Sequence, residues 1–495
     1  MEFTELGDRT TPAGRLVFWT PAAPASAWAD DPRAPALVHE HHVRAAAARG
    51  ARQVDPAWIG VSFRVGPTGR ERLAHALAAW LRAHEHLRSH LLPTPGGCAR
   101  RTLPAGAVGL RREEIGVFAD GASVRRQIEA FFDRVGPLAW PQVLFATVED
   151  VTAGDVTAGD VTAGDVTAPG GVTVFAGADH GVADGLTLAM VPGQIRDLLA
   201  GGAGHPAGPT FLDFGAAEPA LAERLPMRPE HVDRWRALLR GDAGAAPAFP
   251  LPLGAGDAPH AQRSTGRWLL DAPTAARFAA ACRAGGGTTS AGLLSCLALA
   301  AARVAGTRQL SAVALANTRP DPWRAAPGWF VGLQPVRIPT APGATFADTL
   351  GHAAAELRRH RPGPGSSLAH VRRMLGRDVR LRFVVSYLDV RRVDGTPPEQ
   401  EDRMLRSRVH SPGEVHVWLT RSERGVHLTT RFPDTAVART NVARFERAVA
   451  RIAARTALAS RTATAPAAAP AAVPVPVPVL VPASAHCPEE MLPCG

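Results

Sequence analysis

Lysine is absent from this chain of 495 residues, so all 55 of its basic residues are arginine. Asparagine occurs only twice and tyrosine only once. These residue types have AT-rich codons, and their scarcity indicates a very GC-rich genome. A chain without lysine cannot form a lysine Schiff base or hold a phosphate with a phosphate-loop lysine. This absence excludes pyridoxal-phosphate enzymes, lysine-dependent aldolases, ordinary phosphate-loop ATPases and protein kinases.

Long apolar runs and metal-binding cysteine patterns are also missing. The longest apolar run, residues 291–302, is shorter than the ~18–20 residues of a membrane span, and residues 1–15 lack the apolar core of a secretory signal. The five cysteines show neither a CxxC motif nor zinc-site spacing. The adjacent His and Glu residues at 39–42 would face different directions on a helix. We therefore expect a cytoplasmic, soluble protein with no stable membrane insertion and no metal site.

The formal charge of +10 would ordinarily suggest a nucleic-acid partner. Codon usage already explains the arginine excess, however, and the chain has no recognised nucleic-acid motif and little aromatic interleaving. We therefore expect no nucleic-acid partner. A basic rim would instead steer acidic partners towards the protein.

Two low-complexity segments interrupt the chain. Residues 150–169 repeat the pentapeptide Asp-Val-Thr-Ala-Gly, whose period matches neither a helix nor a strand. Because closure entropy grows slowly with loop length, an expanded surface loop is expected there. Residues 462–495 are rich in Ala, Pro and Val, and Val-Pro alternation favours extended polyproline II, which cannot bury a core. We expect this tail to be disordered.

The remaining sequence mixes helical and strand periodicities, which predicts an α/β or α+β fold. Its length suits two or three domains, or two large halves that share a cleft. The predicted helices are residues 70–91, 290–303 and 441–454, and the predicted strands are 172–176, 382–390, 415–420 and 425–432, the last two as an antiparallel pair.

A turn between a strand and a helix carries the most informative residues. His180 could act as a general base, because imidazole has a pKa near ~6.5. Asp184 could fix the turn through backbone hydrogen bonds or an arginine partner, and Gly185 permits a close backbone approach. The alternative is a capped turn with a solvent-facing histidine.

Four segments in order resemble the condensation-domain superfamily of acyltransferases. Residues 83–88 (AHEHLR) resemble its RHExLR segment, and residues 178–185 (ADHGVADG) resemble HHxxxDG with Asp179 in place of the first His. Residues 211–214 (FLDF) resemble YxDF, and residues 328–337 (GWFVGLQPVR) resemble GxFVNxLPxR. The resemblance spans roughly residues 10–455.

Within that superfamily the chain is most similar to the stand-alone polyketide-associated (PapA-type) acyltransferases. The QDxPFE and RDxSRNP segments of peptide-synthetase condensation domains are missing. Residues 383–391 (FVVSYLDVR), 140–141 (WP) and 432–435 (FPDT) stand in the PapA-type pattern instead.

The resemblance implies two chloramphenicol-acetyltransferase-like lobes in a V around a central tunnel. It places the lobes at residues 1–205 and 206–461, followed by the tail. It implies a thioester donor on coenzyme A or on the 4'-phosphopantetheine of an acyl carrier protein, with no permanently bound cofactor. The acyl group would pass to a hydroxyl or amine of a lipid, sugar, polyketide or peptide, with His180 as general base.

The resemblance also assigns roles around the turn. Asp184 would face away from the substrate and pair with an arginine, and Arg88 occupies the matching position, although a solvated helix end is an equal alternative for it. Asp179 could line the tunnel and raise the pKa of His180 by favouring imidazolium, or it could point into the sheet.

Further residues are expected near the tunnel. A hydroxyl of Ser386 or Tyr387 could polarise the thioester, although core packing suits Tyr387 better, and Asn317 could line the wall. Pro192 would kink or shorten the helix after the turn. Pro192, Asp179 and the Gly332 substitution motivate a second hypothesis, a degenerate module that docks carrier proteins without chemistry.

Overall fold

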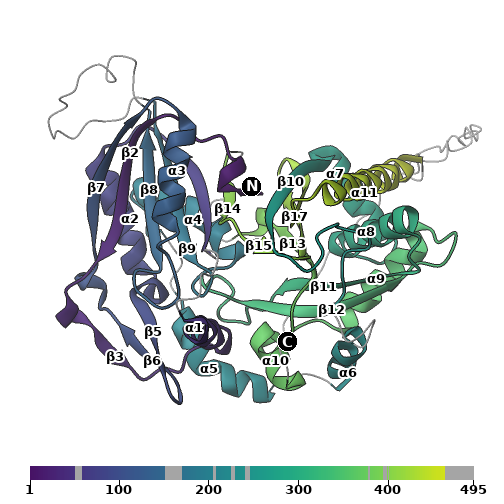
Figure 1. The fold of residues 1–495 in the computed structure, drawn as a ribbon, viewed down its shortest axis with the longest axis horizontal. Helices are drawn as coiled ribbons and strands as arrows, with labels where there is room; N and C mark the ends of the chain where they lie inside the picture. Colours follow the sequence, from purple (N-terminus) through teal and green to yellow (C-terminus); the bar gives the residue numbers. More distant parts are fainter. Residues whose placement is uncertain are drawn as a thin grey trace, which may run out of the picture.

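A computed structural model describes residues 1–50, 58–150, 170–204, 208–224, 229–239, 246–376, 379–393, 399 and 401–462. Two lobes lie side by side, each built on a seven-stranded sheet with helices packed against it (Figure 1). The two-lobed α/β fold predicted from the sequence is therefore confirmed. The repeats at 151–169 and the tail at 463–495 lie outside the described residues.

The first sheet has the strand order β1-β14-β4-β9-β8-β2-β7. Helices α2 and α4 pack on each other and α3 lies against β2, β7 and β8. The bounds are β1 Glu2–Glu5, β2 Gly14–Ala22, β4 Trp58–Val65, β7 Gly109–Phe118, β8 Val143–Glu149, β9 Val172–Asp179, β14 Arg403–Arg406, α2 Arg70–Ala83, α3 Gly121–Phe132 and α4 Gly185–Leu199. A small sheet of β3 Ala29–Asp31, β5 Ser89–Thr94 and β6 Gly97–Thr102 lies beside α1 Leu37–Arg49.

The second sheet has the strand order β12-β11-β13-β16-β17-β10-β15. Its core is closed by α8, whose residues are apolar on all sides and which packs against α9 and α11. The strands are β10 His260–Asp271, β11 Gln309–Asn317, β12 Val331–Pro339, β13 Phe383–Asp389, β15 His410–Ser411, β16 Val415–Ser422 and β17 Gly425–Pro433. The helices are α5 Phe211–Arg224, α6 Pro229–Leu238, α7 Ala272–Ala284, α8 Thr289–Ala305, α9 Phe346–Arg359, α10 Leu368–Leu375 and α11 Ala436–Thr462.

One strand from the second half of the chain completes the first sheet. β14 pairs in parallel with β1 and antiparallel with β4. β1 also reaches the second sheet, where Thr429 donates a hydrogen bond to the Phe3 carbonyl at 3.2 Å and Ser264 donates one to Glu5 at 3.0 Å. The predicted division near residue 205 does not include this exchange, which ties the lobes together.

Three helices differ from their predicted extents. The helix predicted over 70–91 ends at Ala83, because His84 takes extended dihedral angles before a 3-10 turn and β5. The helix predicted over 441–454 runs from 436 to 462 and begins where the Thr435 hydroxyl accepts a hydrogen bond from the Ala438 backbone at 3.0 Å. α4 continues through Pro192 to Leu199, so the expected shortening is wrong; Pro192 is buried in the helix interior.

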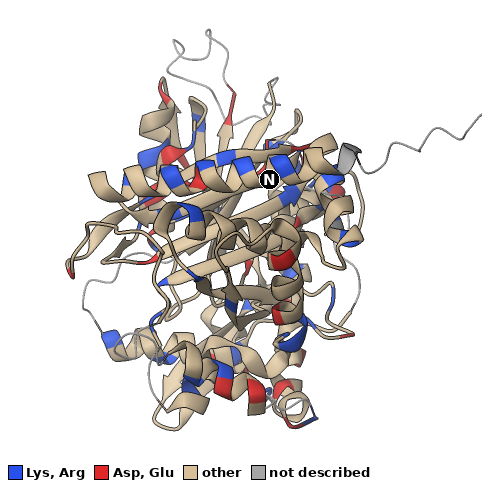
Figure 2. Ribbon diagram, turned by 90° about the vertical axis from the view of Figure 1, so that its right-hand side faces the viewer, with Lys and Arg blue, Asp and Glu red and all other residues tan. Residues whose placement is uncertain are grey.

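The surface of the second lobe carries mixed charge. Figure 2 shows arginines in blue along α11 and acidic residues in red elsewhere on the same face. Among the described residues, no single helix is long and apolar enough to cross a membrane. α7 and α8 satisfy that test only as a pair bent by 94°, by length and composition alone.

Candidate active site

His180 lies in the turn that joins the buried strand β9 to helix α4. β9 lies between β4 and β8, so its end is held on both sides. Asp184 caps α4 by accepting a hydrogen bond from the Thr187 backbone at 2.9 Å. A Cβ atom on Gly185 would lie 3.4 Å from the Phe3 ring, an ordinary van der Waals contact, so the space there does not require glycine. The sequence thus places the strand, turn and capped helix correctly.

Asp184 is held by Arg319, which comes from the second lobe. Two guanidinium nitrogens of Arg319 donate to the two carboxylate oxygens at 2.9 Å each, and the Phe330 backbone donates a further bond at 3.0 Å. Both charged side chains are almost completely buried, at 0% and 2% exposure. Burial alone would raise the pKa of Asp184, but the charge and hydrogen bonds of Arg319 outweigh it and lower that pKa.

The prediction that Arg88 pairs with Asp184 is wrong. Arg88 lies on the 3-10 turn after α2, where its side chain donates to the backbone carbonyls of Arg82 and Leu103. It supports the local chain instead of the site. Arg319 replaces it because the second lobe packs directly against the turn, a long-range contact that motif spacing cannot reveal.

The His180 ring lies against Trp329, with ring centroids 4.4 Å apart. Its Nδ1 is buried and has no hydrogen-bond partner on another described residue. Desolvation, followed by the positive charge of Arg406, lowers the pKa of His180 to about 4. The imidazole is therefore neutral at physiological pH, the form that can accept a proton.

Asp179 is not among the residues that line the His180 cavity, so the predicted tunnel-lining position is wrong for it. Its carboxylate contacts Nε2 of His42 at 3.0 and 3.2 Å and accepts a hydrogen bond from the Gly181 backbone at 2.7 Å. Desolvation would raise the pKa of Asp179, but these contacts lower it overall. Asp179 does act to raise the pKa of His180, as suggested, but desolvation and the charge of Arg406 outweigh it, so that pKa is lowered overall.

A cavity of about 220 Å³ lies between the lobes and is lined by His180. The predicted residues Ser386, Tyr387 and Asn317 line it as well, and so does Gly185. Asp184 is also part of this wall, although the resemblance implied that it would face away from the substrate. Asn317 also accepts a hydrogen bond from Arg319 at 3.1 Å, so it steadies the ion pair. Most other lining residues are apolar: Leu186, Leu188, Leu315, Val331, Leu333, Leu368, Leu381, Val384 and Leu388.

Sequence reasoning missed several polar groups of this cavity. Arg406, His416 and Trp418 line it from β14 and β16. No motif marks them, and Arg406 is one of 55 arginines. Among the described residues, no cluster of three or more metal-binding side chains was found.

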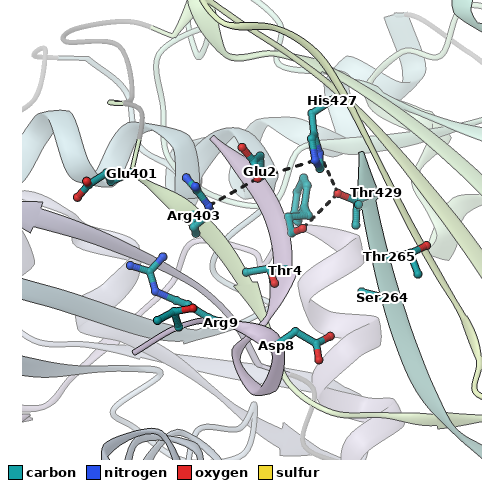
Figure 3. Close-up of a pocket in the computed structure, with 13 residues that line it drawn as sticks. Glu2, Thr4, Asp8, Arg9, Ser264, Thr265, Glu401, Arg403, His427 and Thr429 are labelled. Atoms are coloured by element: carbon teal, nitrogen blue, oxygen red, sulfur yellow. Dashed lines mark hydrogen bonds and ion pairs between the residues drawn. The ribbon is translucent and has the colours of Figure 1, made fainter. Parts of the chain in front are cut away.

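A second, polar cavity of about 560 Å³ borders the first. Figure 3 shows it between β1 and the strands β10 and β17, with Glu2 paired to Arg403 at 3.7 Å and to His427 at 3.8 Å. Phe3 lines both cavities. The two cavities therefore meet at Phe3.

No family model matches the chain. Trehalose-2-sulfate acyltransferase PapA2 of Mycobacterium tuberculosis is 28% identical over 258 residues, which cover 50% of this chain and 54% of that protein. Acyltransferase PapA3 of the same species is 28% identical over 298 residues, covering 55% and 61%. The chain thus spans about half the length of these curated relatives. PapA1 of Mycobacterium bovis, a 2'-acyl-2-O-sulfo-trehalose (hydroxy)phthioceranyltransferase, is 24% identical and covers 91% and 88%.

Solved structures share the fold. A structure of PapA2 acyl transferase has a TM-score of 0.74 at 22% identity and covers 92% of this chain and 100% of that chain. The condensation domain from the Monacolin K polyketide synthase MokA has a TM-score of 0.61 at 18% identity, covering 86% and 97%. The predicted resemblance to condensation-superfamily, PapA-type acyltransferases is therefore confirmed.

Proposed function

We propose that this protein is an acyltransferase that moves an acyl group from a thioester to a hydroxyl or amine, with His180 as general base. The observation that carries the proposal is a neutral histidine in a largely apolar cavity between two lobes, on a turn clamped by a buried ion pair. The names of the relatives, which are acyltransferases, support the same reaction class.

In the proposed reaction, Nε2 of His180 accepts the proton of the acceptor while the acceptor oxygen or nitrogen attacks the thioester carbonyl. The C–S bond then breaks, and the thiolate takes the proton back from the imidazolium and leaves as a thiol. General-base assistance of this kind contributes about 10²–10⁴-fold. A hydroxyl of Ser386 or Tyr387 would polarise the carbonyl oxygen, since both residues line the same cavity.

The donor we propose is an acyl thioester of coenzyme A or of a carrier-protein phosphopantetheine, with no permanently bound cofactor. The proposed acceptor is a small molecule with a sugar or lipid hydroxyl. Support comes from relatives whose names specify acyl transfer to sulfated trehalose. The two cavities that meet at Phe3 offer separate approaches for two substrates.

The two residues that depart from the family motifs, Asp179 and Gly332, are both accommodated by their surroundings. Asp179 is fixed by His42. A Cβ on Gly332 would lie 2.5 Å from a Thr318 methyl group and 2.9 Å from Pro362, so the backbone has room only for glycine there. Neither departure obstructs the cavity, which favours the enzyme over the degenerate docking module.

The test is acyl transfer by the purified full-length chain, followed by mass spectrometry of the acceptor. Acyl-coenzyme A and acylated carrier protein serve as donors, with trehalose, its monosulfate and a fatty alcohol as acceptors. His180→Ala is expected to abolish transfer, and the exposed His352→Ala is the matched control that retains it. Equal transfer by wild type and His180→Ala would refute the proposed base, and carrier-protein binding without transfer would support the docking module.

A further inference from the structure

The cavity contains an arginine that the proposed reaction does not use. Arg406 belongs to β14, where its backbone pairs with Glu5 of β1 and Ile59 of β4. Its side chain lines the His180 cavity, and its guanidinium carbon lies 5.1 Å from the Trp418 ring centroid, on the second sheet. Arg406 therefore reaches from the first lobe to the second at the cavity wall.

No described residue forms a hydrogen bond or an ion pair with the Arg406 guanidinium. Asp184 binds Arg319, whereas Glu5 accepts a hydrogen bond from Ser264 and has a favourable charge interaction with both Arg406 and Arg431. Arg431 stands near the same Trp418 ring at 5.6 Å and adds positive charge. Among the described residues no carboxylate forms an ion pair with Arg406, although the charge of Glu5 acts on its guanidinium from a distance.

The charge persists at neutral pH. Burial, followed by the charge of Arg431, lowers the pKa of Arg406 to about 9, which still leaves the guanidinium protonated. The neighbouring His416 has its pKa lowered well below the usual value, mainly by desolvation, so it stays neutral. The Arg406 guanidinium is half-buried at the cavity wall and has no ion-pair partner among the described residues, so an anion bound in the cavity would compensate its charge.

We infer that Arg406, seated on Trp418, binds an oxyanion group of the acceptor, such as a sulfate, phosphate or carboxylate, beside His180. This inference rests on the proposed function and specifies its substrate class. A guanidinium can donate two parallel N–H hydrogen bonds to two oxygens of an oxyanion.

The acceptor suits this site better than the donor. Arg406 lies close enough to His180 to lower the pKa of that imidazole, and both line one cavity of about 220 Å³. The phosphates of coenzyme A and of phosphopantetheine are separated from the thioester by the extended pantetheine chain. With the thioester at His180, those phosphates would lie outside the cavity.

Binding of inorganic sulfate tests the site without catalysis. Wild type, Arg406→Met and the exposed control Arg455→Met are heated in sodium sulfate and in sodium chloride of equal ionic strength. A saturable sulfate-specific rise in Tm is expected for wild type and Arg455→Met and not for Arg406→Met. Sulfate also stabilises proteins in general because it is excluded from their surface. That rise in Tm does not saturate and should be the same in wild type and both variants. No saturable rise in wild type, or the same rise in Arg406→Met, would overturn the inference.

Kinetics then identify the substrate that carries the anion. Arg406→Met is expected to lower the ratio of kcat/KM for trehalose monosulfate to kcat/KM for trehalose at least about tenfold, the loss of one charge-assisted contact that only the sulfated acceptor makes. Arg406→Lys should restore part of the affinity. An equal loss of kcat on both acceptors would indicate that Arg406 stabilises the transition state. A higher KM for acyl-coenzyme A, but not for a phosphate-free acyl thioester, would indicate that Arg406 binds the donor. Either result would contradict the inference. An inactive wild type would refute the proposed function, while sulfate binding would still decide the site.

Discussion

The buried pair between Arg319 and Asp184 joins the two lobes, and its removal should be costly. Arg319→Met keeps the length of the side chain and leaves a carboxylate buried at 2% exposure without its cation. Breaking a buried pair in this way costs about 3–5 kcal/mol of folding stability. Hydrogen bonds from Arg319 to the carbonyls of Ala326 and Gly328 are lost as well.

A matched control lies five residues away in sequence. Arg324 pairs with Asp321 at 3.1 Å, but both side chains are about three-quarters exposed. An exposed ion pair contributes about 0–1 kcal/mol. Arg324→Met should therefore change the urea midpoint hardly at all, while Arg319→Met lowers it strongly at the same pH.

The effect of Arg319→Met should depend on pH with a definite sign. In wild type Arg319 lowers the pKa of Asp184, so this contribution to stability is present above the unfolded-state pKa and is lost as pH falls through the folded-state value. Without Arg319, desolvation dominates and raises the pKa of Asp184, and protonation relieves the buried charge. The loss of stability in Arg319→Met should thus be smaller at about pH 5 than at about pH 8. Equal urea midpoints for both variants at both pH values would refute this reasoning.

Two further changes have defined outcomes. Because burial and then Arg406 lower the pKa of His180 to about 4, Arg406→Met should move the acidic limb of the kcat/KM profile to higher pH; an unmoved limb would show that the charge does not reach the imidazole. Gly332→Asn restores the family residue but collides with Thr318 and Pro362, and should lower stability by about 1–3 kcal/mol in urea unfolding. An unchanged midpoint would show that this backbone can shift.

Local signals were sufficient for the parts of the site that are contiguous in sequence. Alternating apolar residues placed β9 within a few residues of its bounds, and the turn that carries His180 and Asp184 was expected between a strand and a helix, as observed. The paired strands β16 and β17 were also expected from alternation alone. Such elements are determined by residues that are close together in the sequence, so a single sequence is enough to predict them.

Contacts between distant segments could not be read in the same way. Arg319 lies 135 residues from Asp184, and their pairing depends on how the lobes pack. The entry of β14 into the first sheet has the same origin, because its four residues pair with strands from the start of the chain. Arg406 reaches the cavity through that exchange, so nothing local distinguishes it from the other arginines.

The rate of acyl transfer under single-turnover conditions tests the central claim most directly. With enzyme in excess over acyl thioester, His180→Ala should slow transfer by about 10²–10⁴-fold relative to wild type and to His352→Ala. Circular dichroism should show all three proteins folded. A folded His180→Ala protein that transfers the acyl group at the wild-type rate would contradict the account.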